Sequence, residues 1–284
     1  MAAQLSQLGV ASELVFIKTH GDRTTTPITA AGGQGLFTKE IQRALLDDRI
    51  DLAVHSLKDL PTEVIDELVL AAVPRREDPR DVLVCNNYDA VEQLPEAARV
   101  GTGSRRRQSQ LLHMRPDLQV ADIRGNVDTR LAKLDEGQYD AIILAAAGLK
   151  RLGLEDRASQ LIPCEVMLPA VGQGALGLET RHDDADTITA LAPLDDAHTH
   201  AAVVAERALL AALRAGCLAP VGAWGRVEQV ELKLDAVVLS PDGDSRLAAS
   251  LSGPPETAAT LGTTAAEQLI ERGADELIAQ SREV

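Results

Sequence analysis

The sequence contains few aromatic residues and has no excess of basic charge. Phe, Tyr and Trp make up 2% of its 284 residues, and the formal net charge is −15. Because bare nucleic-acid bases are commonly held by stacking on aromatic rings, the chain offers few platforms for them. General nucleic-acid binding also needs a basic surface, which an acidic chain does not supply as a whole. We therefore predict no nucleic-acid partner.

Long apolar runs are also absent. No segment approaches the roughly 20 apolar residues that a membrane-spanning helix needs, and residues 1–10 do not place an apolar stretch after a basic one, as a signal peptide would. The three cysteines, Cys85, Cys164 and Cys217, are far apart and odd in number, which is typical of reduced thiols. These features predict a cytoplasmic protein without a membrane partner.

The histidines form no metal-binding signature. His198 and His200 lie close together beside Asp195 and Asp196, but no third ligand motif is near them. The cysteines have no metal-type spacing either. We therefore predict no metal site.

What the sequence does contain is an ordinary globular composition, with 45% hydrophobic and 25% charged residues. A chain of 284 residues is too long for one typical domain. Strand and helix patterns alternate along its first part, which predicts parallel sheets with helices on their faces. The first unit contains a helix end at 2–10, strands at 13–19, at Asp51 and at 68–73, and a helix at 36–47.

A charged, proline-broken segment at 75–81 is a plausible crossing into a second α/β unit. That unit has predicted strands at 82–85, 99–101, 118–123 and 141–145, and helices at 106–114 and 127–134. The glycine-punctuated strand at 171–179 could return to the first unit. The remainder predicts a helix at 203–214, a hairpin at 231–251 that turns at 241–244, and a closing helix at 256–272 with Gly273 as its stop signal.

The stretch from Asp51 to Pro61 begins as an apolar, β-favouring run and stops on Lys58 and Asp59. We interpret it as a buried parallel strand that ends in a loop. Ligands of open α/β sheets lie outside the carboxyl ends of the strands, where Lys58 and Asp59 would therefore lie. The alternative interpretation of this pair is a surface ion pair.

Arginine is concentrated in the second unit. Seven arginines and only three acidic residues lie between Arg99 and Arg130. Arg105, Arg106 and Arg107 follow a Gly-Thr-Gly-Ser turn, and Arg124 and Arg130 frame a second strand-to-helix turn. Helix starts attract anions, and the guanidinium fork binds carboxylates with two hydrogen bonds. This pattern favours an anion site, carboxylate or phosphate, over a solvated basic face. No Walker lysine is present, so a nucleotide site is weakly supported.

Cys217 follows the end of a predicted helix, between Gly216 and Pro220, in a tight loop. It is either a structural cysteine or a reactive one, and reactivity would require thiolate character that nothing local supplies.

Taken together, these stretches resemble the porphobilinogen deaminase (hydroxymethylbilane synthase) family of tetrapyrrole biosynthesis. The resemblance runs from about residue 13 to the C-terminus and rests on six motifs, at 51–61, 77–81, 124–130, 139–153, 168–177 and 205–222. It implies two α/β domains similar to periplasmic binding proteins and a smaller α+β C-terminal domain. The expected domain limits are 1–74 with 175–193, 80–168, and 197–284.

The resemblance also implies the site. Cys217 is expected to carry a dipyrromethane cofactor through a thioether bond, and Asp59 with its neighbour Lys58 is expected to be catalytic. The expected cofactor contacts are Lys58, Asp59, Thr102, Ser104, Arg106, Arg107, Arg124, Arg130 and Gln173. The expected substrate contacts are Ser56, Arg124, Arg130 and Arg151.

The implied activity is that of a monomeric transferase of porphyrin and heme biosynthesis. Such an enzyme deaminates four porphobilinogen molecules and condenses them head to tail onto the cofactor, releasing hydroxymethylbilane and ammonia.

The chain departs from the family pattern in two places. The first strand and the Arg-x-Ser-x-Leu-Ala segment that opens the first helix are missing, and Ala30 and Gln34 replace lysines of many members. We expect an unpaired strand edge in the first domain as a result. The alternative function is a catalytically impaired homologue or a binding protein.

Overall fold

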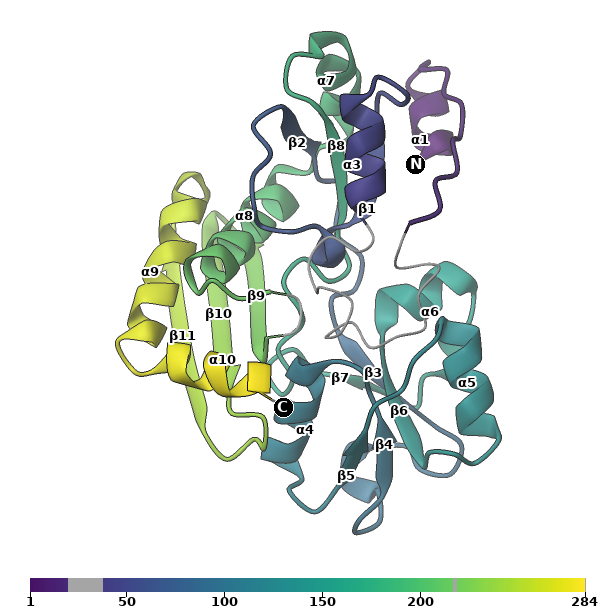
Figure 1. The fold of residues 1–284 in the computed structure, drawn as a ribbon, viewed down its shortest axis with the longest axis vertical. Helices are drawn as coiled ribbons and strands as arrows, with labels where there is room; N and C mark the ends of the chain where they lie inside the picture. The colour runs from purple at the N-terminus through teal and green to yellow at the C-terminus, as the bar shows by residue number, and fades with distance from the viewer. Residues whose placement is uncertain (20–37, 217–218, 284) are drawn as a thin grey trace.

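The computed structural model describes residues 1–19, 38–216 and 219–283. Within these residues the strands form three separate sheets, and helices pack against them (Figure 1). The first sheet lies at one end of the molecule and the second at the other, with the C-terminal unit packed beside both. The predicted α/β class is confirmed, as is a smaller C-terminal unit that combines a three-stranded sheet with helices.

The first sheet has the strand order β1-β8-β2. Strand β8 (Leu176–Arg181) returns from late in the chain, as predicted, and pairs antiparallel with both β1 (Ala53–Ser56) and β2 (Leu68–Ala72). The prediction that the Asp51 strand pairs in parallel is therefore wrong: β1 and β2 run in the same direction, but β8 lies between them. The surrounding helices are α1 (Ala2–Gln7), α3 (Lys39–Leu46) and α7 (Ala185–Leu191).

The strand predicted at 13–19 is also wrong. This segment has no regular secondary structure, and Phe16 is 91% exposed. A β-favouring sequence forms a strand only where a neighbour takes up its backbone hydrogen bonds, and no described strand pairs with it. Among the described residues β1 is an edge strand, because it pairs with β8 alone, and β2 is the other edge of this sheet. A cavity of ≈ 510 Å³ lies between the N-terminal segment and β1.

The second sheet has five strands in the order β5-β4-β6-β3-β7. Strand β4 is parallel to β5 and β6, as predicted, but β3 is antiparallel to β6 and β7. The bounds are β3 (Asp81–Cys85), β4 (Arg99–Gly101), β5 (Gln119–Ala121), β6 (Ala141–Ala145) and β7 (Gln160–Ile162).

Helices cover both faces of this sheet. Leu83 packs with Leu111 of α4 (Arg105–Met114) on one face. Val82 and Val84 pack on the other face, against α5 (Val127–Asp135) and α6 (Ala146–Leu152). Because successive strand residues point to opposite faces, β3 is buried on both sides and is apolar throughout its central residues. The sheet is therefore a rigid support for the turns at its edge.

The C-terminal unit is an antiparallel sheet in the order β11-β10-β9, with the predicted hairpin between its last two strands. Its strands are β9 (Val221–Glu228), β10 (Glu231–Leu239) and β11 (Arg246–Gly253). Helices α8 (Ala197–Ala212) and α9 (Ala258–Ile270) pack closely at Gly262, where any side chain would collide with the carbonyl oxygen of Ala205. The chain closes with α10 (Ala274–Glu283), which follows the predicted stop at Gly273.

Candidate functional site

The Lys58–Asp59 pair lies in a 3-10 turn, η1 (Leu57–Asp59), that directly follows β1. Leu57 is 1% exposed and its N–H donates to the carbonyl of Ala175 at 3.0 Å, so the turn is anchored on the segment before β8. Gly172 allows this close approach, because its φ is +71° and a Cβ there would lie 3.1 Å from the Leu57 backbone. The core thus fixes Leu57 and leaves its two charged neighbours free to face a cavity.

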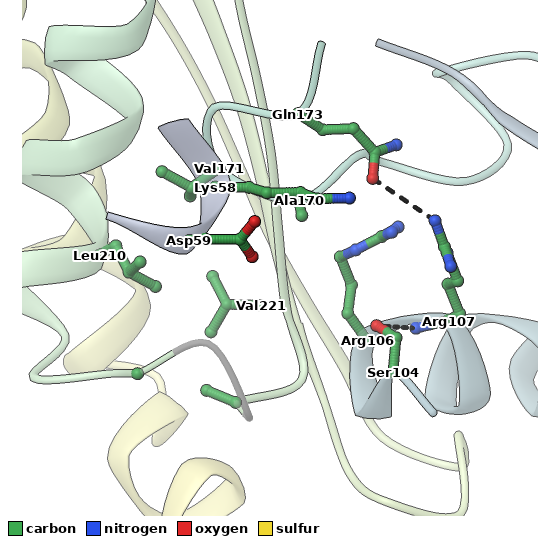
Figure 2. A pocket seen from close by; sticks show the side chains of 12 residues that line it. Lys58, Asp59, Ser104, Arg106, Arg107, Ala170, Val171, Gln173, Leu210 and Val221 are labelled. Carbon is green, nitrogen blue, oxygen red and sulfur yellow. Dashed lines mark hydrogen bonds between the residues drawn. The ribbon is translucent and has the colours of Figure 1, made fainter. Parts of the chain in front are cut away.

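Two cavities meet at this pair. The inner cavity, of ≈ 160 Å³, lies between Lys58, Asp59 and the start of α4, and it reaches Gly216 and Ala219 on either side of residues 217–218. The outer cavity, of ≈ 620 Å³, extends from the same pair toward α5 and α6. Four residues line both cavities: Lys58, Asp59, Arg107 and Gln173. Figure 2 shows Asp59 and Lys58 facing the side chains of Arg106 and Arg107 across the inner cavity.

The arginines of α4 are anchored by a buried carboxylate. Asp81, fully buried at the start of β3, accepts from Arg106 Nη1 at 2.7 Å and from Arg107 Nη2 at 2.8 Å. Gln173 Nε2 donates to the same carboxylate at 2.9 Å. Burial alone would raise the pKa of Asp81, but the two guanidinium groups overcome it and hold that pKa well below its usual range. Two arginines against one carboxylate leave a net positive charge beside the inner cavity.

Arg106 also retains unused hydrogen-bonding capacity. Its Nη1 donates to Asp81 and to the carbonyl of Leu168, but its buried Nε has no acceptor among the described residues. A buried N–H without a partner is costly. Arg106 lines the inner cavity. An anionic or carbonyl group bound there would be able to accept a hydrogen bond from this N–H.

The Lys58–Asp59 pair has perturbed acidities. Removal of hydration by the surrounding protein raises the pKa of Asp59 above 3.8, although Lys58, His55 and Arg151 oppose the rise. Desolvation likewise lowers the pKa of Lys58, against the attraction of Asp59. Asp59 remains open to solvent within the cavities, which limits its shift. Both pKa shifts favour the uncharged form of each group, and shifts of this kind are common where side chains exchange protons.

Most of the predicted site residues line these cavities. Ser104 caps α4 and lines the inner cavity, and Ser56, Arg130 and Arg151 line the outer one. Arg130 lies in the first turns of α5, where desolvation followed by the charges of Arg107 and Arg124 lowers its pKa. The starts of α4 and α5 therefore border the same region.

Two predicted contacts are placed elsewhere. Arg124 lines neither cavity, and its Nε donates to Asp122 at 2.9 Å. Thr102 is buried, and its hydroxyl accepts from the backbone N–H of Ser104, so it shapes the turn before α4. Cys217, Ala30 and Gln34 lie outside the described residues.

Sequence reasoning missed Asp81, Glu77 and Lys150. Asp81 anchors the α4 arginines, and the other two line the outer cavity. The acidic and proline-broken segment at 75–81 contains Glu77 and Asp81, and it was interpreted as a domain crossing and as part of the family resemblance, without a site role for either residue. The sequence signal that could have identified Asp81 is an acidic residue directly before an apolar strand. Such a strand is expected to be buried, and a charge buried with it needs partners.

Comparisons with known proteins now decide the family. Residues 1–189 match the family model described as porphobilinogen deaminase, dipyromethane cofactor binding domain, and residues 200–271 match the model of the porphobilinogen deaminase C-terminal domain. The chain belongs to the porphobilinogen deaminase family. The family consists of transferases of tetrapyrrole biosynthesis, and the first of its two matched domains is described by a dipyrromethane cofactor.

Solved structures with periplasmic-binding-type folds are also similar to this porphobilinogen deaminase homologue. A Bacillus subtilis lipoprotein designated as methionine-binding is 13% identical, with 68% of this chain and 81% of that chain covered and a TM-score of 0.42. A YaeC-family lipoprotein of Enterococcus faecalis is 20% identical, with 54% and 74% covered and a TM-score of 0.37. The periplasmic VFT2 domain of Bordetella pertussis BvgS is 15% identical, with 67% and 74% covered and a TM-score of 0.38.

The described residues contain no group of three or more metal-ligating side chains close enough to hold an ion, and no helix among them is long and apolar enough to cross a membrane.

Proposed function

We propose that the protein is an active porphobilinogen deaminase. It would deaminate four porphobilinogen molecules in turn, join them head to tail onto a dipyrromethane group held on Cys217, and release hydroxymethylbilane and ammonia. The observation that carries this proposal is the position of Lys58 and Asp59 at the junction of two cavities. One cavity is bordered by the residues that flank Cys217, and the other is large and lined by cationic side chains.

The residues around the inner cavity fit the cofactor. A dipyrromethane derived from porphobilinogen carries carboxylates, and the cavity presents Lys58, Arg106 and Arg107 together with the hydroxyl of Ser104. The buried Nε of Arg106, which has no acceptor among the described residues, is suited to a carboxylate oxygen. When bound, the group would supply the pyrrole carbon to which the first substrate is joined, and its thioether would keep the growing chain attached.

The outer cavity fits the incoming substrate. Porphobilinogen carries two carboxylates and an aminomethyl group, and Arg130 and Arg151 supply cationic partners in a space of ≈ 620 Å³. The protein as a whole is acidic, with a formal net charge of −15. Binding a polyanion therefore requires cations that are concentrated locally, and the arginines of the second sheet's turns meet this need.

Asp59 would perform the central electrostatic task. Loss of ammonia from porphobilinogen leaves an electron-poor carbon, and attack on it by a neighbouring ring places transient positive charge on a pyrrole nitrogen. An ionised Asp59 that faces this N–H stabilises the charge, by on the order of a few kcal/mol in a partly dry cleft. Its raised pKa also suits it to give a proton to the departing amine.

Two other functions remain as competing proposals: a catalytically impaired homologue and a binding protein. Both are motivated by the unpaired edge of β1 among the described residues. The enzyme proposal is favoured because a binding protein has no need of an acid and a lysine with shifted pKa values at the junction of two cavities. We retain the expectation of a monomeric, cytoplasmic enzyme.

Intact mass and turnover together test the proposal. The purified protein should be heavier than its sequence by two porphobilinogens less two ammonias, and it should convert porphobilinogen to hydroxymethylbilane. The Cys217→Ser variant should lack this added mass and fail to react with Ehrlich's reagent, whereas Cys85→Ser should keep both properties. Added mass without turnover would support an impaired homologue. Neither property in the parent protein, or retention of the group in Cys217→Ser, would refute the assignment.

A further inference from the structure

An ion pair in the lining of the outer cavity joins two elements that are far apart in sequence. Lys150, in the last turn of α6, places its Nζ 2.7 Å from Oε2 of Glu77, in the segment that links the first and second sheets. Both side chains line the outer cavity, and they are 55% and 43% exposed. The pair therefore lies at the solvent side of the space assigned to the substrate.

The two partners differ in how firmly they are held. The Glu77 backbone N–H donates to the carbonyl of Gly174 at 2.9 Å, and its Oε1 accepts from the N–H of Asp78 at 3.0 Å. Lys150 has a long flexible side chain, and among the described residues its ammonium pairs with Glu77. Its neighbour on α6, Arg151, lines the same cavity. If the pair separates, the lysine can move to a new partner while Glu77 keeps a hydrogen bond to its carboxylate.

An acid at the entrance of a site for carboxylates calls for an explanation. Glu77 neutralises the lysine that α6 adds beside Arg151, and it thereby removes one cationic partner from the cavity. An exposed ion pair of this kind is weak and exchanges its partners readily. A carboxylate on the substrate or on the growing chain offers Lys150 an equivalent partner at little net cost.

We propose that Lys150 is a substrate-binding residue for which Glu77 is an exchangeable counter-ion. This inference rests on the proposed function. A carboxylate of porphobilinogen, or of the chain made from it, replaces Glu77 on the Lys150 ammonium. Glu77 therefore competes with the substrate for Lys150 and weakens binding, and Lys150 strengthens it.

The proposal requires effects of opposite sign from the two halves of one ion pair. In the cofactor-bearing enzyme, Lys150→Gln should raise the KM for porphobilinogen by about two- to five-fold, as expected for one exposed charge contact. Glu77→Gln should lower KM by a similar factor, about two- to five-fold. kcat should change little in either variant. The double variant should match Lys150→Gln, because Glu77 acts through the lysine.

The C-terminal sheet supplies a matched control. Lys233 and Glu228 form an ion pair of the same length, 2.7 Å, with side chains 40% and 49% exposed, and neither residue lines the two cavities. Lys233→Gln and Glu228→Gln should leave KM unchanged. Thermal unfolding of all four single variants should shift by similar small amounts, which separates binding from a purely structural role.

Parallel changes of KM in Lys150→Gln and Glu77→Gln, or changes no larger than those of the control pair, would overturn the inference. Its failure is distinguishable from failure of the proposed function. If the parent protein produces no hydroxymethylbilane, the proposed function fails. The same proteins are then titrated with porphobilinogen at equilibrium, and the Kd must change in these opposite directions for the inference to stand.

Discussion

At the scale of single residues, the carboxyl group of Asp59 determines how the site should respond to pH. The loss of hydration raises its pKa above 3.8, so the group takes up a proton at a higher pH than an ordinary aspartate does. If the ionised carboxylate is the active form, kcat/KM should fall as pH decreases through this raised pKa. Asp59→Asn keeps the shape and loses the charge, and it should slow turnover by about 100-fold or more, equivalent to about 2.7 kcal/mol.

Pre-steady-state binding and a pH profile of kcat/KM check both parts of this prediction. The Asp59→Asn variant should still bind porphobilinogen, and its remaining activity should lack the parent's acid limb. An acid limb at or below 3.8, or near-normal turnover by the variant, would show that another group carries the step.

The guanidinium of Arg130 differs from that of Arg124 in what it can contact. Arg130 lines the outer cavity, whereas Arg124 donates to Asp122 and lines neither cavity. An ammonium cannot reproduce the two-pronged contact of a guanidinium with a carboxylate. Arg130→Lys should therefore raise KM for porphobilinogen by about five- to ten-fold, through loss of about 1 kcal/mol or slightly more. Arg124→Lys should have a smaller effect in the same steady-state assay, and an equal or larger one would contradict this difference.

Residue types and their spacing predicted several of the charged side chains that line the two cavities. The Lys58–Asp59 pair and the two arginine-rich turns depend on local sequence, because a strand end or a helix start fixes where those side chains lie. The partners of these side chains come from distant segments. Nothing in the local sequence shows that Asp81 engages Arg106 and Arg107, or that Glu77 meets Lys150.

At the scale of elements, α4 is held in place by one buried acid. Asp81 receives both Arg106 and Arg107, and its pKa lies well below the usual range because of them. Removing one partner of a buried ion pair leaves uncompensated charge, so Asp81→Asn should lower the free energy of unfolding by about 3–5 kcal/mol. Urea denaturation at neutral pH measures this loss. Asp135→Asn, which breaks an exposed pair with Arg157, should cost far less.

The pH dependence of this contribution follows from the direction of the shift. The folded pKa of Asp81 is depressed below 3.8, so its stabilising contribution is fully present above the unfolded pKa and is lost as pH falls through the folded one. The difference in stability between parent and Asp81→Asn should therefore narrow below about pH 4. A difference that stays constant down to strongly acidic pH would assign the loss to packing instead.

The pattern of elements was predictable wherever periodicity is local. Helices α4 and α5, strands β4 and β6, and the C-terminal hairpin lie within a few residues of their predicted positions. The direction of strand pairing in the first sheet was not predictable, because β8 inserts between β1 and β2 from more than 100 residues away in the chain. Helix α6 was missed because it starts at Ala146, directly after β6 ends at Ala145, with no turn signal between them.

At the scale of the whole molecule, Glu206 joins the C-terminal unit to the rest of the chain. Its side chain is fully buried on α8 and accepts from Arg76 Nη1 at 2.6 Å. It also accepts from the backbone N–H groups of Gly172 and Gly225, each at 2.7 Å. One carboxylate thus connects the segment between the first and second sheets, the segment before β8, and strand β9. These connections fix the C-terminal unit, and with it the flanks of Cys217, relative to Asp59.

Replacing Glu206 by Gln should loosen this joint. The amide has nearly the same shape, but it carries no charge to pair with Arg76. It also places an NH₂ group where the neighbouring N–H donors need an acceptor. Loss of one member of a buried charged network costs about 3–5 kcal/mol. We expect a lower unfolding temperature, and faster proteolytic cleavage of the segments between α8 and the first two sheets. Turnover should fall at temperatures where the variant is still folded, because the flanks of Cys217 are no longer held at a fixed distance from Asp59.

A comparison with Glu228→Gln separates this joint from a general loss of negative charge. Glu228 is half exposed on the C-terminal sheet, where it pairs with Arg226 and Lys233, so the change in net charge is the same while the buried contacts remain. The control should unfold and turn over like the parent. Arg76→Lys should give an intermediate loss, since an ammonium retains the charge but cannot bond to both carboxylate oxygens in the same geometry. If Glu206→Gln proves as stable and as protease-resistant as the control, the C-terminal unit must be held by its apolar contacts, and the carboxylate is not the joint.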